Sequence, residues 1–191
     1  MQDQEFQFFI EREKQTTNAI RQMISFTRDY QDIGLYRPQW QNLDTIVHLL
    51  AKTLDFHGVV LIINLRYLEI FADPLLEKVV YTLIENALRH GRSLTSIKFS
   101  YKITDAGCII LCDDNGIGIK TAEKEKIFEQ GFGKHTGFGL YLAREILGIT
   151  GFTIKETGIF GKGARFEIFV PEGAFQVNTK PALTDGGSTG T

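Results

Sequence analysis

The segment ADPLLEKVVYTLIENALRHG, residues 72–91, opens with a helix-start signal and continues with apolar residues at helical spacing. Asp73 suits an N-cap and Pro74 suits the first helical position, because the amide hydrogen that proline lacks would be unpaired there. Leucine, valine and isoleucine side chains then recur three or four residues apart up to about His90. We therefore predict one amphipathic helix from Asp73 to His90.

This helix ends in a polar block, TLIENALRHG (82–91), and two more polar blocks follow it in the chain. They are DDNGIGI (113–119) and GFGKHTGFGL (131–140), and both contain several glycines. Each block alone is a weak signal, because glycine serves in any turn and an asparagine on a helix usually caps it or faces solvent. Their combination and their order along the chain are a more specific signal than any one block.

Outward from the helix, alternating or continuous apolar runs predict strands in pairs. We predict three hairpins, formed by residues 59–64 with 67–72, 97–103 with 108–112, and 152–157 with 164–170. A further helix is predicted over 138–150. Helices that alternate with hairpins predict an α/β (α+β) sandwich, with a mixed, mainly antiparallel sheet and helices on one face.

The N-terminal region reads as a long helix over residues 1–33, because it lacks proline and glycine from Asp3 to Asp32. Its apolar stripe needs a covering partner, so we expect a second helix or a homodimer there. We predict a linker over 34–42, with Trp40 starting a short helix and Asn42 as its N-cap. The domain would span 43–173, and residues 174–191 are polar and glycine-rich enough to predict disorder.

Composition removes several classes of function. The formal net charge of the 191 residues is −2 without long charged blocks, so we expect no nucleic-acid partner. No apolar run approaches the length of a membrane span, which argues against direct membrane insertion and favours a cytoplasmic protein. Cys108 and Cys112 lie on one face of a predicted strand, too far apart for a disulfide, and are expected to be buried thiols.

Together the three blocks resemble the N, G1 and G2 boxes of the ATPases shared by histidine kinases, gyrase-type topoisomerases, Hsp90 and MutL. IFE at 127–129 resembles the F box, and GKGAR at 161–165 resembles the final glycine turn. Within that family, residues 72–91 and the short lid are similar to sensor histidine kinases. The stretch 131–151 is similar to PAS-linked kinases common in archaea. The resemblance implies a Bergerat ATP-binding fold over 73–171, with ATP and Mg²⁺ as ligands.

The resemblance also implies roles for individual residues. It makes Asn86 the Mg²⁺ ligand, and a carboxamide oxygen is a hard neutral donor of the kind this ion accepts. It makes Asp114 the acceptor of the exocyclic amine of adenine, which would compensate a carboxylate at the end of a buried strand. Gly116 and Gly118 would let the base approach the backbone. Glu85 is either structural or helps to polarise an acceptor.

The third block would hold the phosphates. Gly137 and Gly139 precede a helix whose first amide groups are free to bind anions. Lys134 is the preferred phosphate-contacting cation, with His135 and Arg89 as further candidates, and His90 would line the site. The remaining residues predicted to contact the nucleotide are Ile119, Thr136 and Leu140.

The chain departs from a complete kinase in its histidines, since none of His48, His57, His90 or His135 fits the family's acceptor pattern. Residues 1–33 resemble the second helix of the dimerisation hairpin, so we expect the chain to begin after the acceptor helix. The acceptor helix and a response regulator are the expected partners. Two alternatives stay open: a nucleotide-binding, sequestering module of the anti-sigma type, and an ATP hydrolase. Thr82 disfavours the hydrolase, because threonine cannot activate water as a base near neutral pH.

Overall fold

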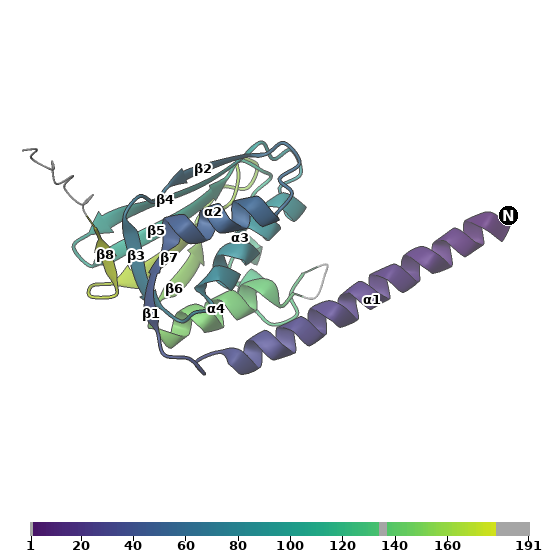
Figure 1. Cartoon of the computed structure of the whole chain (residues 1–191). Coiled ribbons are helices and arrows are strands. Elements are labelled where there is room, and N and C mark those ends of the chain that lie inside the picture. Colours follow the sequence, from purple (N-terminus) through teal and green to yellow (C-terminus); the bar gives the residue numbers. More distant parts are fainter. Residues whose placement is uncertain (1, 134–136, 179–191) are drawn as a thin grey trace, which may run out of the picture.

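The computed structural model describes residues 2–133 and 137–178, which form a long N-terminal helix and a layered α/β domain (Figure 1). The helices are α1 (Gln2–Asp32), α2 (Leu43–Thr53), α3 (Leu76–His90) and α4 (Gly139–Ile149), with short 3-10 turns η1 (Thr121–Glu123) and η2 (Lys126–Phe128). The strands are β1 (Gln39–Asn42), β2 (Val60–Asn64), β3 (Leu68–Ala72), β4 (Ser96–Thr104), β5 (Gly107–Asp114), β6 (Thr153–Glu156), β7 (Arg165–Pro171) and β8 (Phe175–Val177).

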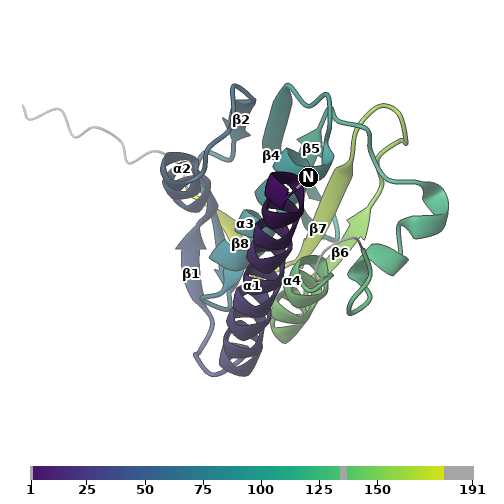
Figure 2. The same cartoon turned by 90° about the vertical axis from the view of Figure 1, so that its right-hand side faces the viewer.

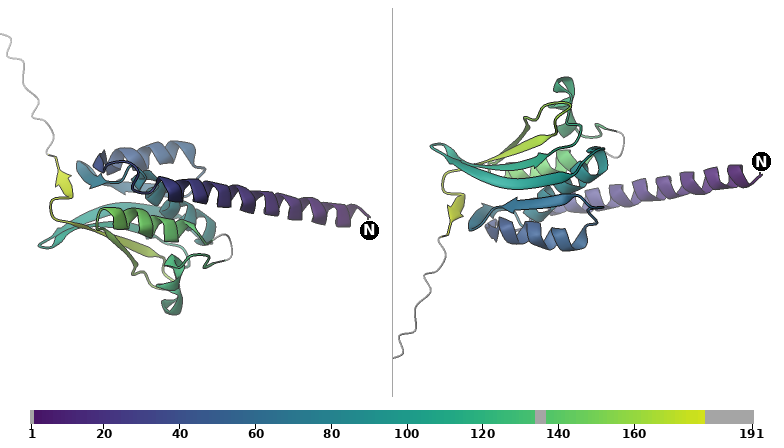
Figure 3. Two further views of the ribbon diagram at one scale, coloured as in Figure 1. Left: turned by 90° about the horizontal axis from the view of Figure 1, so that it is seen from below. Right: turned by 90° about the horizontal axis from the view of Figure 1, so that it is seen from above.

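The larger sheet has five strands in the order β2-β4-β5-β7-β6. β2 runs parallel to β4, and the other neighbours are antiparallel. Helices cover one face of this sheet, and its other face is open (Figures 2 and 3). The predicted fold class, an α/β sandwich with a mixed, mainly antiparallel sheet, is confirmed.

The core lies between this sheet and the helices. Alternation along β4 and β5 turns every second side chain inward, so Phe99, Ile110 and both cysteines are buried. Cys108 and Cys112 are free thiols, as predicted. Burial raises the pKa of Cys108 to about 12 and that of Cys112 well above its usual value. Both thiols are therefore protonated and unreactive in the native state.

A second, smaller sheet was not predicted. It has the order β1-β3-β8, and all its pairs are antiparallel. The predicted hairpin of 59–64 with 67–72 is therefore wrong, because β2 pairs with β4 in the larger sheet whereas β3 pairs with β1 and β8. The chain changes sheet at Tyr67, which has a φ of 65°.

Three predicted boundaries also move. Residues 39–42 belong to the domain as β1, so the predicted linker 34–42 ends early and Trp40 lies in a strand. Asn42 does cap α2, accepting a hydrogen bond from the Thr45 amide at 2.9 Å. Residues 175–177 form β8, so the prediction of disorder from residue 174 onward is wrong there. Residues 179–191 lie outside the described part of the chain.

The start of α3 also differs from the prediction. Asp73 is not the N-cap, because the helix begins at Leu76 after a turn that Asp73 closes by accepting the Leu75 amide at 2.8 Å. Its other carboxylate oxygen accepts the Gly34 amide at 3.1 Å. The carboxylate of Asp73, which is buried, thus joins the start of α3 to the end of α1.

The last turns of α1 pack on the domain, and the rest of the helix projects away from it (Figure 1). Phe26 stacks on Phe138 with ring centroids 4.2 Å apart, and Asp29 pairs with Lys78 of α3 at 3.3 Å. Large apolar side chains further along α1 are more than half exposed: Phe6, Phe8, Phe9, Ile20, Met23 and Ile24. Among the described helices, none combines the length and the hydropathy needed to cross a bilayer.

Candidate functional site

The polar face of α3 carries part of the predicted site. Thr82, Glu85, Asn86 and Arg89 follow the i, i+3, i+4, i+7 spacing that places side chains on one side of a helix. The opposite side of α3 is buried in the core. The apolar stripe of residues 76–87 therefore fixes the orientation of the helix and turns the polar stripe towards α4 and α1.

A cavity of about 560 Å³ brings the first two blocks together, because Asn86 of α3 and Asp114 of β5 both line it. Its walls are completed by α4, by the β6–β7 turn and by the connection from β5 to α4, which we call the lid segment (residues 120–133). From the predicted site, the residues that line it are Asn86, His90, Asp114, Gly118, Ile119 and Leu140. A volume of this size and a mixed polar and apolar lining suit a small-molecule ligand.

Asp114 is held by backbone amides on both sides. Its Oδ1 accepts the Gly116 amide at 2.8 Å and the Ala164 amide at 3.1 Å. Burial raises the pKa of this carboxyl above its ordinary value of 3.8, the two amide hydrogen bonds lower it, and the charges of Glu156 and Asp113 raise it. Oδ2 has no hydrogen-bond partner within the described residues, so it is available to a ligand in the cavity.

This raised pKa predicts an unusual pH dependence of stability. Between the unfolded pKa of about 3.8 and the higher folded pKa, the native state binds more protons, so the free energy of unfolding rises as the pH falls. Asp114→Asn keeps an oxygen acceptor but removes the buried charge. We therefore expect the ligand-free variant to be more stable than the parent at pH 7, with a difference that shrinks as the pH falls.

Denaturant unfolding of both proteins in parallel between pH 4 and pH 8 measures this difference. Contributions from other carboxylates are common to the two proteins and cancel. A difference that stays constant with pH, or grows in acid, would contradict the assignment of a destabilised charge to Asp114.

Two glycines in the second block serve close backbone contacts. Gly116 lies outside the cavity lining, and a Cβ there would come within 2.5 Å of the Gly91 Cα at the end of α3. Gly118 lines the cavity with φ of 70°, and a Cβ would lie 2.7 Å from the Gly163 carbonyl oxygen. The glycines therefore lock β5 onto the end of α3 and onto the β6–β7 turn.

The third block forms the start of α4. Gly137 has φ of 64°, and a Cβ there would meet the Gly131 carbonyl carbon at 2.4 Å. Gly139 lies against Thr82 of α3, where a Cβ would be 3.1 Å from the threonine methyl group. Within the described residues no side chain caps α4, whose N-cap is Phe138. As far as those residues show, its first amide groups are thus available to an anion.

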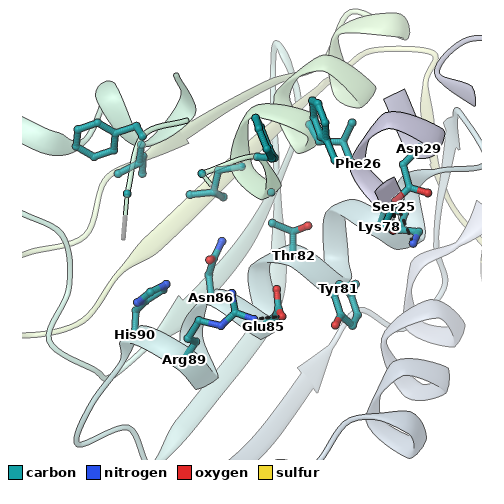
Figure 4. Close-up of a pocket in the computed structure, with 18 residues that line it drawn as sticks. Ser25, Phe26, Asp29, Lys78, Tyr81, Thr82, Glu85, Asn86, Arg89 and His90 are labelled. Carbon is teal, nitrogen blue, oxygen red and sulfur yellow. Dashed lines mark hydrogen bonds and ion pairs between the residues drawn. The ribbon is translucent and has the colours of Figure 1, made fainter. Parts of the chain in front are cut away.

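Figure 4 shows a second cavity, of about 330 Å³. It adjoins the first, because residues that include Asn86, His90 and Leu140 line both. Ser25, Phe26 and Asp29 of α1 form part of its wall. Figure 4 shows Arg89 turned towards Glu85, with which it forms an ion pair on α3.

The structure thus distributes the predicted residues over two adjoining cavities. Glu85, Arg89, Gly137 and Gly139 line the smaller cavity and not the larger one. Lys134, His135 and Thr136 lie outside the described residues. Several residues of the larger cavity were not predicted from the sequence, of which the most notable are Arg92, Lys120 and Phe160. The Lys120 ammonium lies 5.9 Å from the centre of the Phe160 ring. Lys120 follows the DDNGIGI block directly, and that position could have indicated it.

Comparisons with known proteins identify the family of the domain that contains this site. A family model described as histidine kinase-, DNA gyrase B- and HSP90-like ATPase matches residues 72–174. The probable C4-dicarboxylate sensor kinase of Bacillus subtilis (strain 168) is 34% identical over 97 residues, which cover 47% of this chain and 18% of that protein. The alginate biosynthesis sensor protein KinB of Pseudomonas aeruginosa is 35% identical over 101 residues, covering 50% and 17%. The matched part is thus less than a fifth of either relative.

Solved structures resemble the whole domain. The ATP binding domain of PrrB from Mycobacterium tuberculosis has a TM-score of 0.58 and 25% identity, covering 71% of this chain and 98% of that one. Full-length ShkA in complex with AMPPNP has a TM-score of 0.65 and 16% identity, covering 84% and 37%, and supports the fold alone. The family model spans more than half of the chain. The resemblance drawn from the three blocks is therefore confirmed, and the chain belongs to the family of histidine kinase-, DNA gyrase B- and HSP90-like ATPases.

Proposed function

We propose that this chain is the ATP-binding catalytic domain of a sensor histidine kinase, and that it transfers the γ-phosphoryl group of ATP to a histidine outside these 191 residues. The observation that supports this most strongly is the shared cavity of Asp114 and Asn86. A carboxylate that binds adenine and an amide that binds the metal must line the same cavity if they are to bind the two ends of one nucleotide.

The roles of the residues follow from their surroundings. Asp114 accepts the adenine amine on Oδ2, while its Oδ1 is fixed by two backbone amides. The start of α4, which no side chain of the described residues caps, binds phosphate oxygens, and Lys120 and Lys134 add positive charge. Glu85 is paired with Arg89 in the smaller cavity, where it either supports the structure or helps to polarise the acceptor.

Asn86 is the residue that would hold Mg²⁺. Its side chain lines both cavities, and within the described residues its carboxamide makes no hydrogen bond that would occupy the oxygen. A neutral oxygen donor of this kind fits an ion that is otherwise coordinated by phosphates and water. When bound, the ion neutralises phosphate charge during transfer.

Transfer to the acceptor depends on positioning, because a phosphoryl group needs little covalent help from the protein. Thr82 lines the smaller cavity and packs against Gly139 at the start of α4, but its hydroxyl has no basicity near neutral pH, so it supplies no base for water. The incoming nucleophile is the acceptor histidine itself. This favours a kinase over a rapidly hydrolysing ATPase.

The remaining assignments concern partners and location. We propose that α1 is the second helix of a dimerisation hairpin, since its exposed apolar side chains would be covered by a partner helix. The other partners would be the acceptor helix and a response regulator. Two free thiols and the use of ATP suit the cytoplasm.

The proposal is tested by supplying the acceptor in trans. A two-helix acceptor hairpin from one of the similar sensor kinases is incubated with this chain, Mg²⁺ and ATP labelled on the γ-phosphate. We expect acid-labile label on the hairpin and none on this chain, with hairpin lacking the histidine as the control. Binding of ATP without transfer would instead favour a sequestering module, and steady phosphate release without the hairpin would favour a hydrolase.

A further inference from the structure

A buried carboxylate outside the nucleotide cavity has no role in the function proposed above. Glu156 ends β6, and its side chain is 0% exposed. Removing a carboxylate from water is costly unless hydrogen bonds and an opposite charge compensate it. The residues that contact Glu156 therefore indicate which parts of the structure this charge holds together.

One oxygen of Glu156 binds the β6–β7 turn. Oε1 accepts the Gly158 amide at 2.9 Å and the Arg165 amide at 3.1 Å, and these two residues flank the turn. A Cβ at Gly158 would come within 2.6 Å of this oxygen, so the turn is closed tightly around it.

The other oxygen faces the lid segment. Lys124 lies between η1 and η2, and its ammonium is 2.7 Å from Oε2 and also donates to the Gly158 carbonyl. The Lys124 side chain is 18% exposed, so the ion pair is largely shielded from solvent. Within the described residues Oε2 has no hydrogen-bond partner, and its compensation comes from the charge of Lys124. The pair thus ties the lid segment to the β6–β7 turn.

The same turn holds Asp114 in place. The Ala164 amide donates to Asp114 Oδ1 at 3.1 Å, and the Asp114 amide donates to the Ala164 carbonyl at 2.9 Å. A Cβ at Gly163 would lie 1.9 Å from the Asp114 carbonyl oxygen, so the two backbones are in direct contact. The turn and the Gly116 amide therefore together set the direction of the Asp114 carboxylate.

We infer that the Lys124–Glu156 ion pair is a positioning pair for nucleotide binding, which clamps the lid segment to the β6–β7 turn and thereby fixes the Asp114 carboxylate for adenine. This inference rests on the proposed function, because it assigns the clamp to that site. It makes the affinity for ATP depend on two residues that need not touch the nucleotide base.

The test compares Lys124→Met, Glu156→Gln and the double variant, with the exposed Lys102→Met on β4 as the matched control. ATP affinity is measured by calorimetry, and folding by thermal unfolding without nucleotide. Lys124→Met leaves an unpaired buried charge and is expected to weaken ATP binding about tenfold or more. Glu156→Gln keeps an acceptor for both turn amides, so its loss is expected to be only a few-fold. The double variant should bind better than Lys124→Met, because the unpaired charge is gone.

A pH profile separates positioning from a general loss of structure. The charged groups that bear on Asp114 are Asp113 on its own strand, which is paired with Arg165 of β7, and Glu156 of β6 with its partner Lys124. The acid limb of ATP binding is the pH range in which affinity falls because Asp114 becomes protonated. Without Lys124, the uncompensated carboxylate of Glu156 should move this limb to higher pH. Glu156→Gln should move it to lower pH. A merely structural defect would weaken binding without these opposite displacements.

Affinities within twofold of the parent in all three variants, or additive losses with an unmoved acid limb, would overturn the inference. If Lys124→Met does not fold, Glu156→Gln and the double variant decide the matter through the direction of the acid limb. Failure of the parent chain to bind ATP would overturn the proposed function as well. Normal binding by the parent, lost on Asp114→Ala but unaffected in the pair variants, would overturn the positioning pair alone.

Discussion

Asp114→Ala is expected to abolish measurable ATP binding while the domain stays folded. The substitution removes Oδ2, which is free for the adenine amine, and Oδ1, which orders the Gly116 and Ala164 amides at the cavity wall. A hydrogen bond to a charged group contributes about 1.5–3 kcal/mol, and loss of the wall adds to it, so we expect affinity to fall at least about a hundredfold. Calorimetric titration with ATP measures the loss.

The fold of this variant is not expected to fail, because the substitution also removes a carboxylate whose burial raises its pKa. Thermal unfolding without nucleotide checks this. Asp114→Asn is the matched control, since its side-chain oxygen can still accept both amides, and it should retain more affinity than Asp114→Ala. Binding of ATP by Asp114→Ala at the parent's affinity would remove Asp114 from the site and would leave the kinase proposal without its main support.

Asn86→Ala is expected to remove the Mg²⁺ dependence of ATP binding. In the parent, the ion would join the carboxamide oxygen to the phosphates, so ATP should bind more tightly with Mg²⁺ than with EDTA. In the variant the protein's ligand is missing, and the ratio of the two affinities should fall to about one. Adenine recognition by Asp114 is untouched, so affinity in EDTA should stay near that of the parent.

Titrations of both proteins in Mg²⁺ and in EDTA measure this ratio. Asn64→Ala, at the exposed end of β2, is the matched control because it removes the same group from a residue that lines neither cavity. An undiminished Mg²⁺ effect in Asn86→Ala would show that the cation is held elsewhere. Loss of affinity in both conditions would indicate that Asn86 supports the nucleotide directly.

The fold was predictable where the pattern along the chain is local. Apolar spacing identified α3, and alternation identified the β4–β5 hairpin. The pairing of β2 was not predictable in this way, because alternation reveals a strand but not the neighbour it will join. β8 has three residues and is stabilised by its pairing with β3, far away in the sequence, so composition alone predicted disorder there.

The residues of the candidate site were likewise predictable only where the sequence pattern is local. Asn86 and Asp114 could be singled out because each lies in a block of recognisable sequence, and the structure places both in the lining of one cavity. Arg89 was predicted to face phosphates, but Glu85 lies one helical turn before it and draws it into a local ion pair. The Glu156–Lys124 pair was missed because its members are 32 residues apart and neither lies in a block that drew attention.

The two cysteines buried in β5 have a practical consequence for all these measurements. Reagents that attack thiolates cannot reach Cys108 or Cys112 until the central strand of the larger sheet separates from its neighbours. The rate of labelling by such a reagent therefore reports how often the sheet opens. Bound ATP would slow labelling, and more so the more tightly it binds. The rate at which the two natural thiols are labelled can therefore report ATP binding in every variant.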